Sequence, residues 1–206
     1  MARTDDYENA KKIAIENLST IAFETIASYS GFDPLVDDKF RVPFLDRIYQ
    51  IEYPEFVFIS EDSHEIPIQE QVLLLHYMSG RPLTEFSKWV AYREIQGASF
   101  YYSAFVKRAI DPLKKVFGNQ IKILKHTAKK MNAQTVEYGD LGLEFPIFPN
   151  ITIRIILWKG DDEFPPEANI LFPNNINEIL SAEDIAWLAG MLVYRLIALS
   201  KDTMTD

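Results

Sequence analysis

Residues 151–167 read ITIRIILWKGDDEFPPE, and they constrain the architecture more strongly than any other part of the chain. The first half, Ile151–Trp158, is dense in β-branched residues, which predicts a buried strand. Gly160 allows the chain to reverse, three acids follow, and two prolines then stop the sheet from extending. A second strand over 169–172 leads away. The stretch therefore predicts two strands joined by an acidic turn that proline stiffens.

Strand and helix patterns continue on both sides of this stretch. Further strands are expected at 40–44, 47–53, 56–59, 89–95, 135–138 and 143–148, and helices at 6–28, 68–79, 120–131 and 185–199, with another helix that runs through Phe105 and ends at Gly118. These elements predict a single α+β domain over residues 1–206, with helices packed on a mixed or antiparallel sheet. Its parts are an N-terminal helix (5–29), a first β-rich unit (38–80), a central strand–helix segment (85–132), and a second β-rich unit with the C-terminal helix (135–200).

Two segments of the chain show a similar pattern. Residues 42–45 read VPFL and residues 145–148 read FPIF, and each is followed by a β-rich stretch and then by a helix that begins with acids. This similarity suggests an internal duplication of a strand–strand–helix unit. The alternative, a coincidence of strands interrupted by proline, stays open.

Composition and charge exclude several kinds of site and disfavour several kinds of partner. The chain has 206 residues, a formal net charge of −9 and no cysteine, which excludes disulfides, zinc–thiolate sites and cysteine nucleophiles. A negative surface disfavours binding to nucleic acid or to anionic membranes. The N-terminal segment is polar, so no signal peptide is predicted, and we expect a cytoplasmic protein without membrane or nucleic-acid partners.

Several motifs together resemble a known prokaryotic family, the domain of unknown function DUF3786. The motifs are VPFL (42–45), LLLHY (73–77), WVAYREIQG (89–97), YGD (138–140), LWKGDDEFP (157–165), ILF (170–172) and ED (183–184). The resemblance implies a setting in anaerobic bacteria and archaea but no particular activity. Some members carry a cysteine-rich iron–sulfur segment, which this chain without cysteine does not share.

The acidic turn is the first candidate site. Asp161, Asp162 and Glu163 have the oxygen ligands that suit a hard cation, and Trp158 and Phe164 could form an apolar wall beside them. However, the EF-hand spacing is absent, and three successive acids cannot all face one ion. The alternative is a solvated turn, the more frequent use of charged turn residues.

The second candidate site surrounds Arg93. With Gly97, Ser99 and the start of the following helix, Arg93 could bind an anion, because helix N-termini present unpaired N–H groups. Tyr101 and Tyr102 could line an adjacent pocket for a flat ligand, although aromatic residues more often fill the core. We expect the two candidate sites to border one cavity.

The sequence favours a non-catalytic protein that binds a small ligand, or an accessory protein of anaerobic metabolism. No complete catalytic constellation and no dinucleotide or phosphate-loop motif is present. No metal site is assigned, and the cofactor, if any, is not identified. Two alternatives remain: a metal-assisted hydrolase or transferase that uses residues 161–163, and a protein-interaction module whose acidic turn meets a basic partner.

Overall fold

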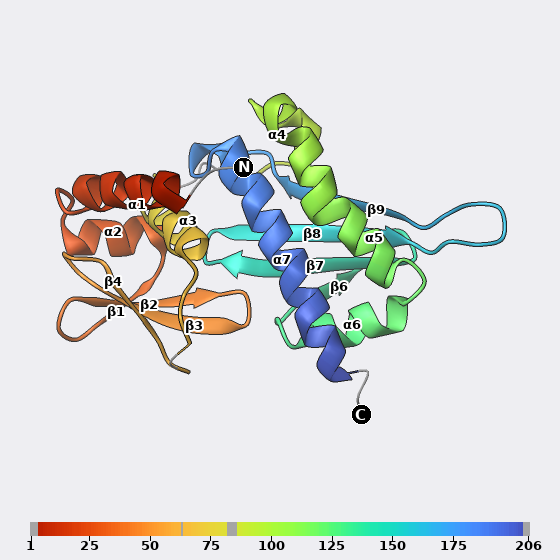
Figure 1. Ribbon diagram of the computed structural model, residues 1–206, viewed down its shortest axis with the longest axis horizontal. Helices are drawn as coiled ribbons and strands as arrows, with labels where there is room; N and C mark the ends of the chain where they lie inside the picture. The colour runs from red at the N-terminus through yellow and green to blue at the C-terminus, as the bar shows by residue number, and fades with distance from the viewer. Residues whose placement is uncertain (1–3, 63, 82–85, 204–206) are drawn as a thin grey trace. The chain divides into compact units, whose positions relative to one another are not determined.

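The computed structural model describes residues 4–62, 64–81 and 86–203. The chain divides into two compact units (Figure 1). Unit 1 takes in Met1–Thr84 and Glu178–Leu180, and unit 2 takes in Glu85–Asn177 and Ser181–Asp206. Helices accompany two antiparallel sheets, so the predicted α+β class is confirmed.

Unit 1 is a four-stranded antiparallel meander with three helices. In chain order its elements are α1 (Thr4–Leu18), α2 (Phe23–Ser30), β1 (Asp33–Leu35), β2 (Lys39–Phe44), β3 (Arg47–Glu52), β4 (Val57–Ser60) and α3 (Ile68–Met78). Every second residue of β2 is buried, which puts Phe40, Val42 and Phe44 in the core, as the period of a strand requires.

The single N-terminal helix predicted over 6–28 was wrong, because the structure has two helices there. Past Leu18, the hydroxyl of Ser19 donates to the carbonyl of Ile15 and that of Thr20 to the carbonyl of Asn17. Such local bonds compete with helix continuation. The expected stop at Gly31 is confirmed, since this glycine has a left-handed φ of 71°.

Unit 2 contains a five-stranded antiparallel sheet in the order β5-β9-β8-β7-β6. Its strands are β5 (Trp89–Ala91), β6 (Gln134–Val136), β7 (Leu141–Phe148), β8 (Ile151–Trp158) and β9 (Glu167–Pro173). The middle strand β8 has the bounds that the sequence predicts, and its Ile153, Ile155 and Leu157 are fully buried.

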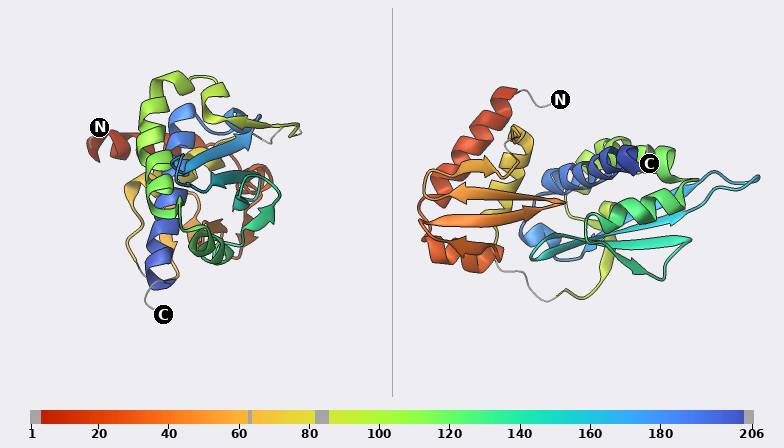
Figure 2. Two further views of the ribbon diagram at one scale, coloured as in Figure 1. Left: turned by 90° about the vertical axis from the view of Figure 1, so that its right-hand side faces the viewer. Right: turned by 90° about the horizontal axis from the view of Figure 1, so that it is seen from below.

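Helices cover one face of this sheet, as the right-hand view of Figure 2 shows. They are α4 (Ala98–Phe105), the π-helical turn η2 (Val106–Ile110), α5 (Asp111–Phe117), α6 (Ile121–Lys129) and α7 (Ala182–Thr203), with the 3₁₀ helix η3 (Ile176–Glu178) preceding α7. The elements α4, η2 and α5 follow one another without a break. Pro112 lacks the N–H that an α-helix would direct at the carbonyl of Arg108, which accounts for the wider π turn just before it.

The strand predicted over 89–95 is shorter than expected. Pairing stops at Ala91, and the chain turns into the 3₁₀ helix η1 (Tyr92–Glu94). The Glu94 carboxylate accepts a 2.7 Å hydrogen bond from the backbone N–H of Ala91, and this bond closes the turn.

Both units share one order of elements. Unit 1 runs α2, β1–β4, α3, and unit 2 runs α6, β6–β9, α7, with each set of four strands forming an antiparallel meander. This order agrees with the suggested duplication, which remains a hypothesis. A helix precedes the shared order in each unit, α1 in unit 1 and α4–η2–α5 in unit 2, whereas β5 has no equivalent among the described residues of unit 1.

Candidate functional site

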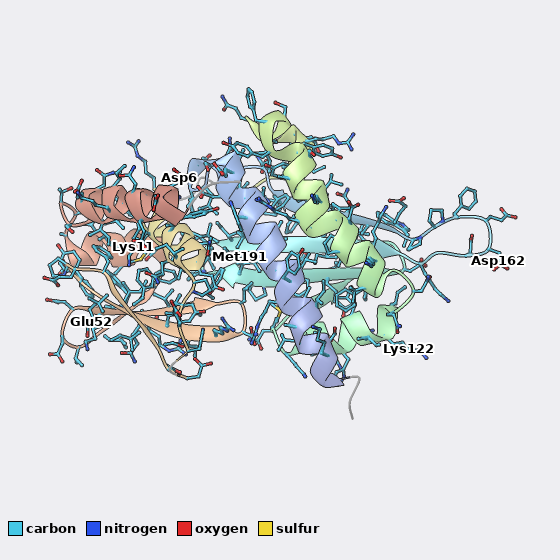
Figure 3. The ribbon with its side chains drawn as sticks, in the orientation of Figure 1. Asp6, Lys11, Glu52, Lys122, Asp162 and Met191 are labelled. Atoms are coloured by element: carbon cyan, nitrogen blue, oxygen red, sulfur yellow. The ribbon has the colours of Figure 1, made fainter. Side chains whose placement is uncertain are left out.

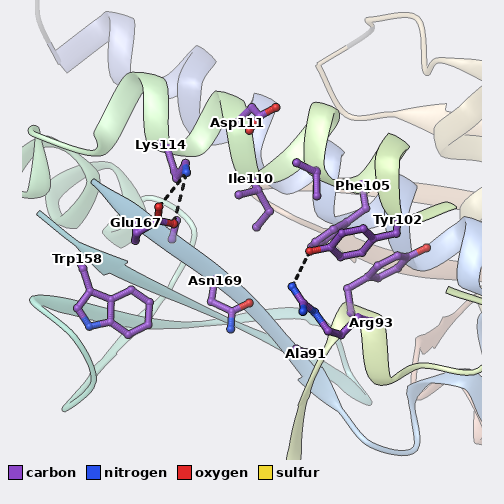
Figure 4. Close-up of a pocket in the computed structure, with 13 residues that line it drawn as sticks. Ala91, Arg93, Tyr102, Phe105, Ile110, Asp111, Lys114, Trp158, Glu167 and Asn169 are labelled. Carbon is purple, nitrogen blue, oxygen red and sulfur yellow. Dashed lines mark hydrogen bonds and ion pairs between the residues drawn. The ribbon is translucent and has the colours of Figure 1, made fainter. Parts of the chain in front are cut away.

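Unit 2 contains a groove of about 380 Å³ between the outer edge of β9 and the helix formed by α4, η2 and α5 (Figure 4). We call it the edge groove. It is lined by Ala91, Tyr92, Arg93, Tyr102, Phe105, Val106, Ile110, Asp111, Lys114, Trp158, Glu167, Ala168 and Asn169.

Arg93 and Tyr102 form one end of the edge groove. The guanidinium Nη2 donates a 2.8 Å hydrogen bond to the Tyr102 hydroxyl, and the guanidinium carbon lies 5.3 Å from the centre of that ring. This contact holds an exposed arginine in place, because the hydroxyl and the ring face both favour the cation. The end of the groove is therefore positively charged and partly ordered without any ligand.

A buried aromatic stack supports this end. Tyr92 lies parallel to Phe105, with ring centres 4.2 Å apart and an interplanar angle of 12°. The Tyr92 hydroxyl donates a 2.7 Å hydrogen bond to the carbonyl of Ala182 at the start of α7. Burial raises the pKa of Tyr92 far above its ordinary value, so the hydroxyl stays protonated. The stack fixes η1 against α4, and the hydrogen bond fixes it against α7.

Lys114 and Glu167 form the other end of the edge groove. The Lys114 ammonium lies 3.3 Å from one Glu167 carboxylate oxygen and 3.4 Å from the other, and so joins α5 to the first residue of β9 (Figure 4). The indole of Trp158, 42% exposed, lies beside them at the end of β8.

Close packing at the base of the β8–β9 hairpin positions this end. A Cβ added to Gly118 would lie 2.4 Å from Pro166 Cγ and 2.5 Å from the Lys114 carbonyl oxygen. A Cβ added to Gly160 would lie 2.8 Å from Pro166 Cδ. Only glycine fits at either position without displacing Pro166, which directly precedes Glu167 in β9.

The floor of the edge groove is an open strand edge. β9 has seven residues, but β5 pairs only with Leu171–Pro173, opposite Ala91, Val90 and Trp89. In the part of the chain that the structure describes, no strand lies beside the outer edge of residues 167–170. Alternate residues of a strand direct their N–H and C=O groups to that side. The groove therefore presents backbone donors and acceptors as well as side chains.

The structure brings together three of the predicted site residues, Arg93, Tyr102 and Trp158. Gly97, Ser99 and Tyr101 do not line the groove. Gly97 has a φ of +82° and turns the chain into α4, and Ser99 is exposed in the first turn of that helix. Tyr101 is hydrogen-bonded to the Glu183 carboxylate of α7, which raises the pKa of this tyrosine.

The acidic turn also lies apart from the groove. Asp161, Asp162, Glu163 and Phe164 are exposed, with Phe164 67% accessible, and Figure 3 shows Asp162 at the far end of the β8–β9 loop. One Asp161 carboxylate oxygen accepts the backbone N–H groups of Glu163 (2.9 Å) and Phe164 (2.7 Å). These two bonds hold the pKa of Asp161 below its usual value. The observed geometry is that of a solvated turn, and the expectation that the acids and Arg93 border one cavity was wrong.

No group of three or more His, Cys, Asp or Glu side chains that could hold a metal ion occurs among residues 4–62, 64–81 and 86–203. The metal-assisted hydrolase or transferase that would use residues 161–163 therefore stays a prediction.

Sequence reasoning missed the side of the edge groove that α5 and β9 provide. Lys114 and Asn169 come from segments predicted only as generic helix and strand, and Glu167 ends the predicted acidic turn without having been singled out as a site residue. One signal was present: proline at position 112 inside a helical pattern marks an irregular turn. The Lys114–Glu167 pair had no such signal, since its partners are 53 residues apart.

Comparison with known proteins gives one match. The family described as "Domain of unknown function (DUF3786)" matches residues 22–195. No curated protein and no solved structure matches the chain. Within the described residues, no helix has the length and apolar character needed to cross a membrane.

Proposed function

The chain belongs to the DUF3786 family, and from this starting point we propose that it is a non-catalytic binding protein whose ligand occupies the edge groove. One observation carries the proposal. Arg93, Tyr102 and Trp158, from three separate elements, line one hollow of about 380 Å³. Binding sites are commonly hollows of this size with an apolar lining and a few polar groups.

The chemistry of the lining supports binding rather than catalysis. The groove contains no serine, cysteine or histidine, so it lacks the nucleophile and base of the common acyl-transfer sites. Its polar groups are a guanidinium, an amide, a phenol, the Asp111 carboxylate and an ion pair, all suited to holding a ligand by hydrogen bonds.

A thermal-shift screen of the full chain tests this function. The screen uses amino acids, short peptides, nucleotides, tetrapyrroles and divalent metals as separate classes. A ligand of the edge groove should raise the melting temperature of the wild type and lose most of that effect in Arg93→Ala. Lys122→Ala is the matched control, because Lys122 is exposed on α6 and does not line the groove.

Tryptophan fluorescence locates the binding event. All three tryptophans, Trp89, Trp158 and Trp187, belong to unit 2, and only Trp158 lines the groove. A ligand-induced change should therefore disappear in Trp158→Phe. If every ligand that stabilises the protein acts equally on Arg93→Ala and Lys122→Ala, the edge groove is not the site.

A second function has one specific observation in its favour. Phe164 is 67% exposed at the tip of the acidic hairpin, and exposed aromatics beside charges are typical of protein-interaction surfaces. This function predicts a basic partner whose binding weakens with salt and with Asp162→Lys. Binding that survives both changes would rule it out.

A further inference from the structure

We propose that the ligand of the edge groove is an extended peptide that adds to β9 as a new antiparallel strand and places an Asp or Glu side chain against Arg93. This inference rests on the proposed function and names the chemical class of its ligand. It starts from the open backbone edge of β9, because a strand edge recognises another strand more specifically than it recognises any other ligand.

The register of the sheet defines where the peptide would lie. β5 runs antiparallel to β9 until Ala91, which is opposite Leu171, and then turns away into η1. The positions that β5 would have occupied next are those opposite residues 170, 169, 168 and 167. The peptide would continue the line of β5 over these four positions, a length of roughly 13 Å.

The helix formed by α4, η2 and α5, which we call the helix wall, lies beside this edge and forms the other side of the groove. Val106 and Ile110 of η2 and Phe105 of α4 line the groove above the strand. They offer apolar contact to alternate side chains of an added strand, all of which would point to the same face. Known peptide-binding domains use main-chain bonds to an edge for affinity and pockets for alternate side chains for specificity.

The charged side chains of the groove indicate which peptide sequences would bind. On the α5 side of the groove, Lys114 is already paired with Glu167, and the Asp111 carboxylate also lines the groove, so an acidic side chain is disfavoured there. At the other end, Arg93 contacts the Tyr102 hydroxyl but forms no ion pair with any described residue. A guanidinium binds a carboxylate through two parallel hydrogen bonds, so an acidic side chain is the complementary group at this end.

The direction of the sheet gives the peptide an orientation. Every strand pair in this sheet is antiparallel. A peptide antiparallel to β9 has its N-terminal end near Arg93 and its C-terminal end near Glu167. The acidic residue therefore belongs near the N-terminus of the bound segment.

A defined peptide library tests the proposal. The library has the form Ac-X-Glu-X-X-X-NH₂, where X is randomised and both terminal charges are removed, and a parallel library has Gln in place of Glu. Each is screened against the immobilised full chain, and the best binders are measured by titration with the Trp158 signal. We expect binders from the Glu library whose affinity falls about tenfold or more when Glu becomes Gln.

Two further measurements distinguish strand addition from side-chain binding. First, Arg93→Ala should weaken binding of the Glu peptide about tenfold and leave binding of the Gln peptide nearly unchanged. The difference is the coupling energy between Arg93 and the Glu side chain of the peptide. Second, single amide-to-ester replacements along the peptide should weaken binding roughly two- to tenfold at alternate positions and have no effect between them. Lys122→Ala should leave every affinity unchanged.

The outcomes separate this inference from the proposed function. Peptides that bind without sensitivity to the esters, or without coupling to Arg93, overturn the peptide proposal. Self-association of the chain that blocks the groove, seen as a concentration-dependent mass, overturns it as well. If no library member binds more tightly than about 1 mM while another ligand class depends on Arg93, the peptide proposal fails and the binding function stands. If no ligand class depends on Arg93, both fail.

Discussion

The last strands of the two meanders, β4 and β9, differ in length and in how much of their outer edge is paired. β4 in unit 1 has four residues, is the terminal strand of its sheet, and is followed directly by the exposed acids Glu61 and Asp62. β9 in unit 2 has seven residues, of which β5 covers three. A short edge beside charges is protected against pairing, whereas a long edge that is partly covered offers a defined place for one more strand.

The difference arises where unit 2 departs from the shared order of elements. Among the described residues, β5 and η1 have no equivalent in unit 1, and η1 supplies Arg93. The helix wall of α4, η2 and α5 contacts α7 and precedes the shared order, as α1 contacts α3 and precedes that order in unit 1. If the two meanders descend from one unit, the Arg93 end of the candidate site belongs to β5 and η1, which are additions to the repeated order.

The largest effect is expected for Tyr92→Ala. This change removes the ring stacked on Phe105 and the hydrogen bond to the Ala182 carbonyl. Loss of a buried aromatic side chain costs about 3–5 kcal/mol of unfolding free energy. Urea unfolding followed by tryptophan fluorescence reports on unit 2, because all three tryptophans are there.

Phe164→Ala is the matched control for this prediction. It deletes an aromatic ring of similar size from the hairpin tip, where the ring is 67% exposed. The expected change is within about 0.5 kcal/mol. A cost close to that of Tyr92→Ala would mean that the tip is packed in solution, and the contrast between groove and tip would then be wrong.

The next effect is expected for Gly118→Ala, which forces a Cβ to within 2.4 Å of Pro166 Cγ. Overpacking of this kind costs about 2 kcal/mol, and it should also weaken any ligand of the groove by moving Glu167. Gly190→Ala in α7 is the control. Its new Cβ would meet nothing nearer than Arg108 Cβ at 3.5 Å, so the change should be neutral or stabilise by up to about 1 kcal/mol. Equal destabilisation by the two variants would contradict the role given to Gly118.

Much of the fold was predictable, because it depends on local signals. The β-branched run of β8 identified a buried strand with the observed bounds, and glycines at positions 31 and 118 marked helix ends. The N-terminal helix was predicted as one because apolar periodicity continues through residues 19–22. The periodicity did not reveal that two hydroxyls turn back onto the helix backbone.

The candidate site was only half predictable, for a physical reason. Arg93, Tyr102 and Trp158 were recognised as functional types of residue, and the structure brings them together. Asp161–Phe164 were grouped with Trp158 as one candidate site and expected to share a cavity with Arg93. A hairpin carries its tip away from its base at about 3.3 Å per residue, so proximity in sequence did not become proximity in space. The edge of β9 is open because β5 ends at Ala91, and no local sequence pattern predicted where β5 ends.

A smaller effect is expected for the ion pair at the groove. In unit 1, Lys39 lies 2.7 Å from Glu52, whereas in unit 2, Lys114 lies 3.3 Å from Glu167. Glu167→Gln should cost less than about 1 kcal/mol, because exposed pairs contribute little, and Glu52→Gln should shift the urea midpoint further. Far-UV circular dichroism at low and high salt compares them. The loss of unfolding free energy in each variant should be smaller at high salt. A larger loss for Glu167→Gln than for Glu52→Gln would indicate that the groove pair is less exposed than it is in the structure.

The smallest effect, and the one most dependent on pH, is expected for Asp161→Asn. Two backbone N–H groups bond the Asp161 carboxylate and hold its pKa below the ordinary value of aspartate. Because the pKa in the folded state is depressed, the contribution to stability is present above the unfolded pKa and is lost as the pH falls through the folded value. Wild type and Asp161→Asn should therefore differ slightly at neutral pH and converge in acid. An NMR titration of the Asp161 carboxyl carbon gives the pKa directly, for comparison with the ordinary value of aspartate. A pKa for Asp161 equal to or above the ordinary value of aspartate would show that the two backbone bonds do not persist in solution, and that the hairpin tip lacks the local order of the structure.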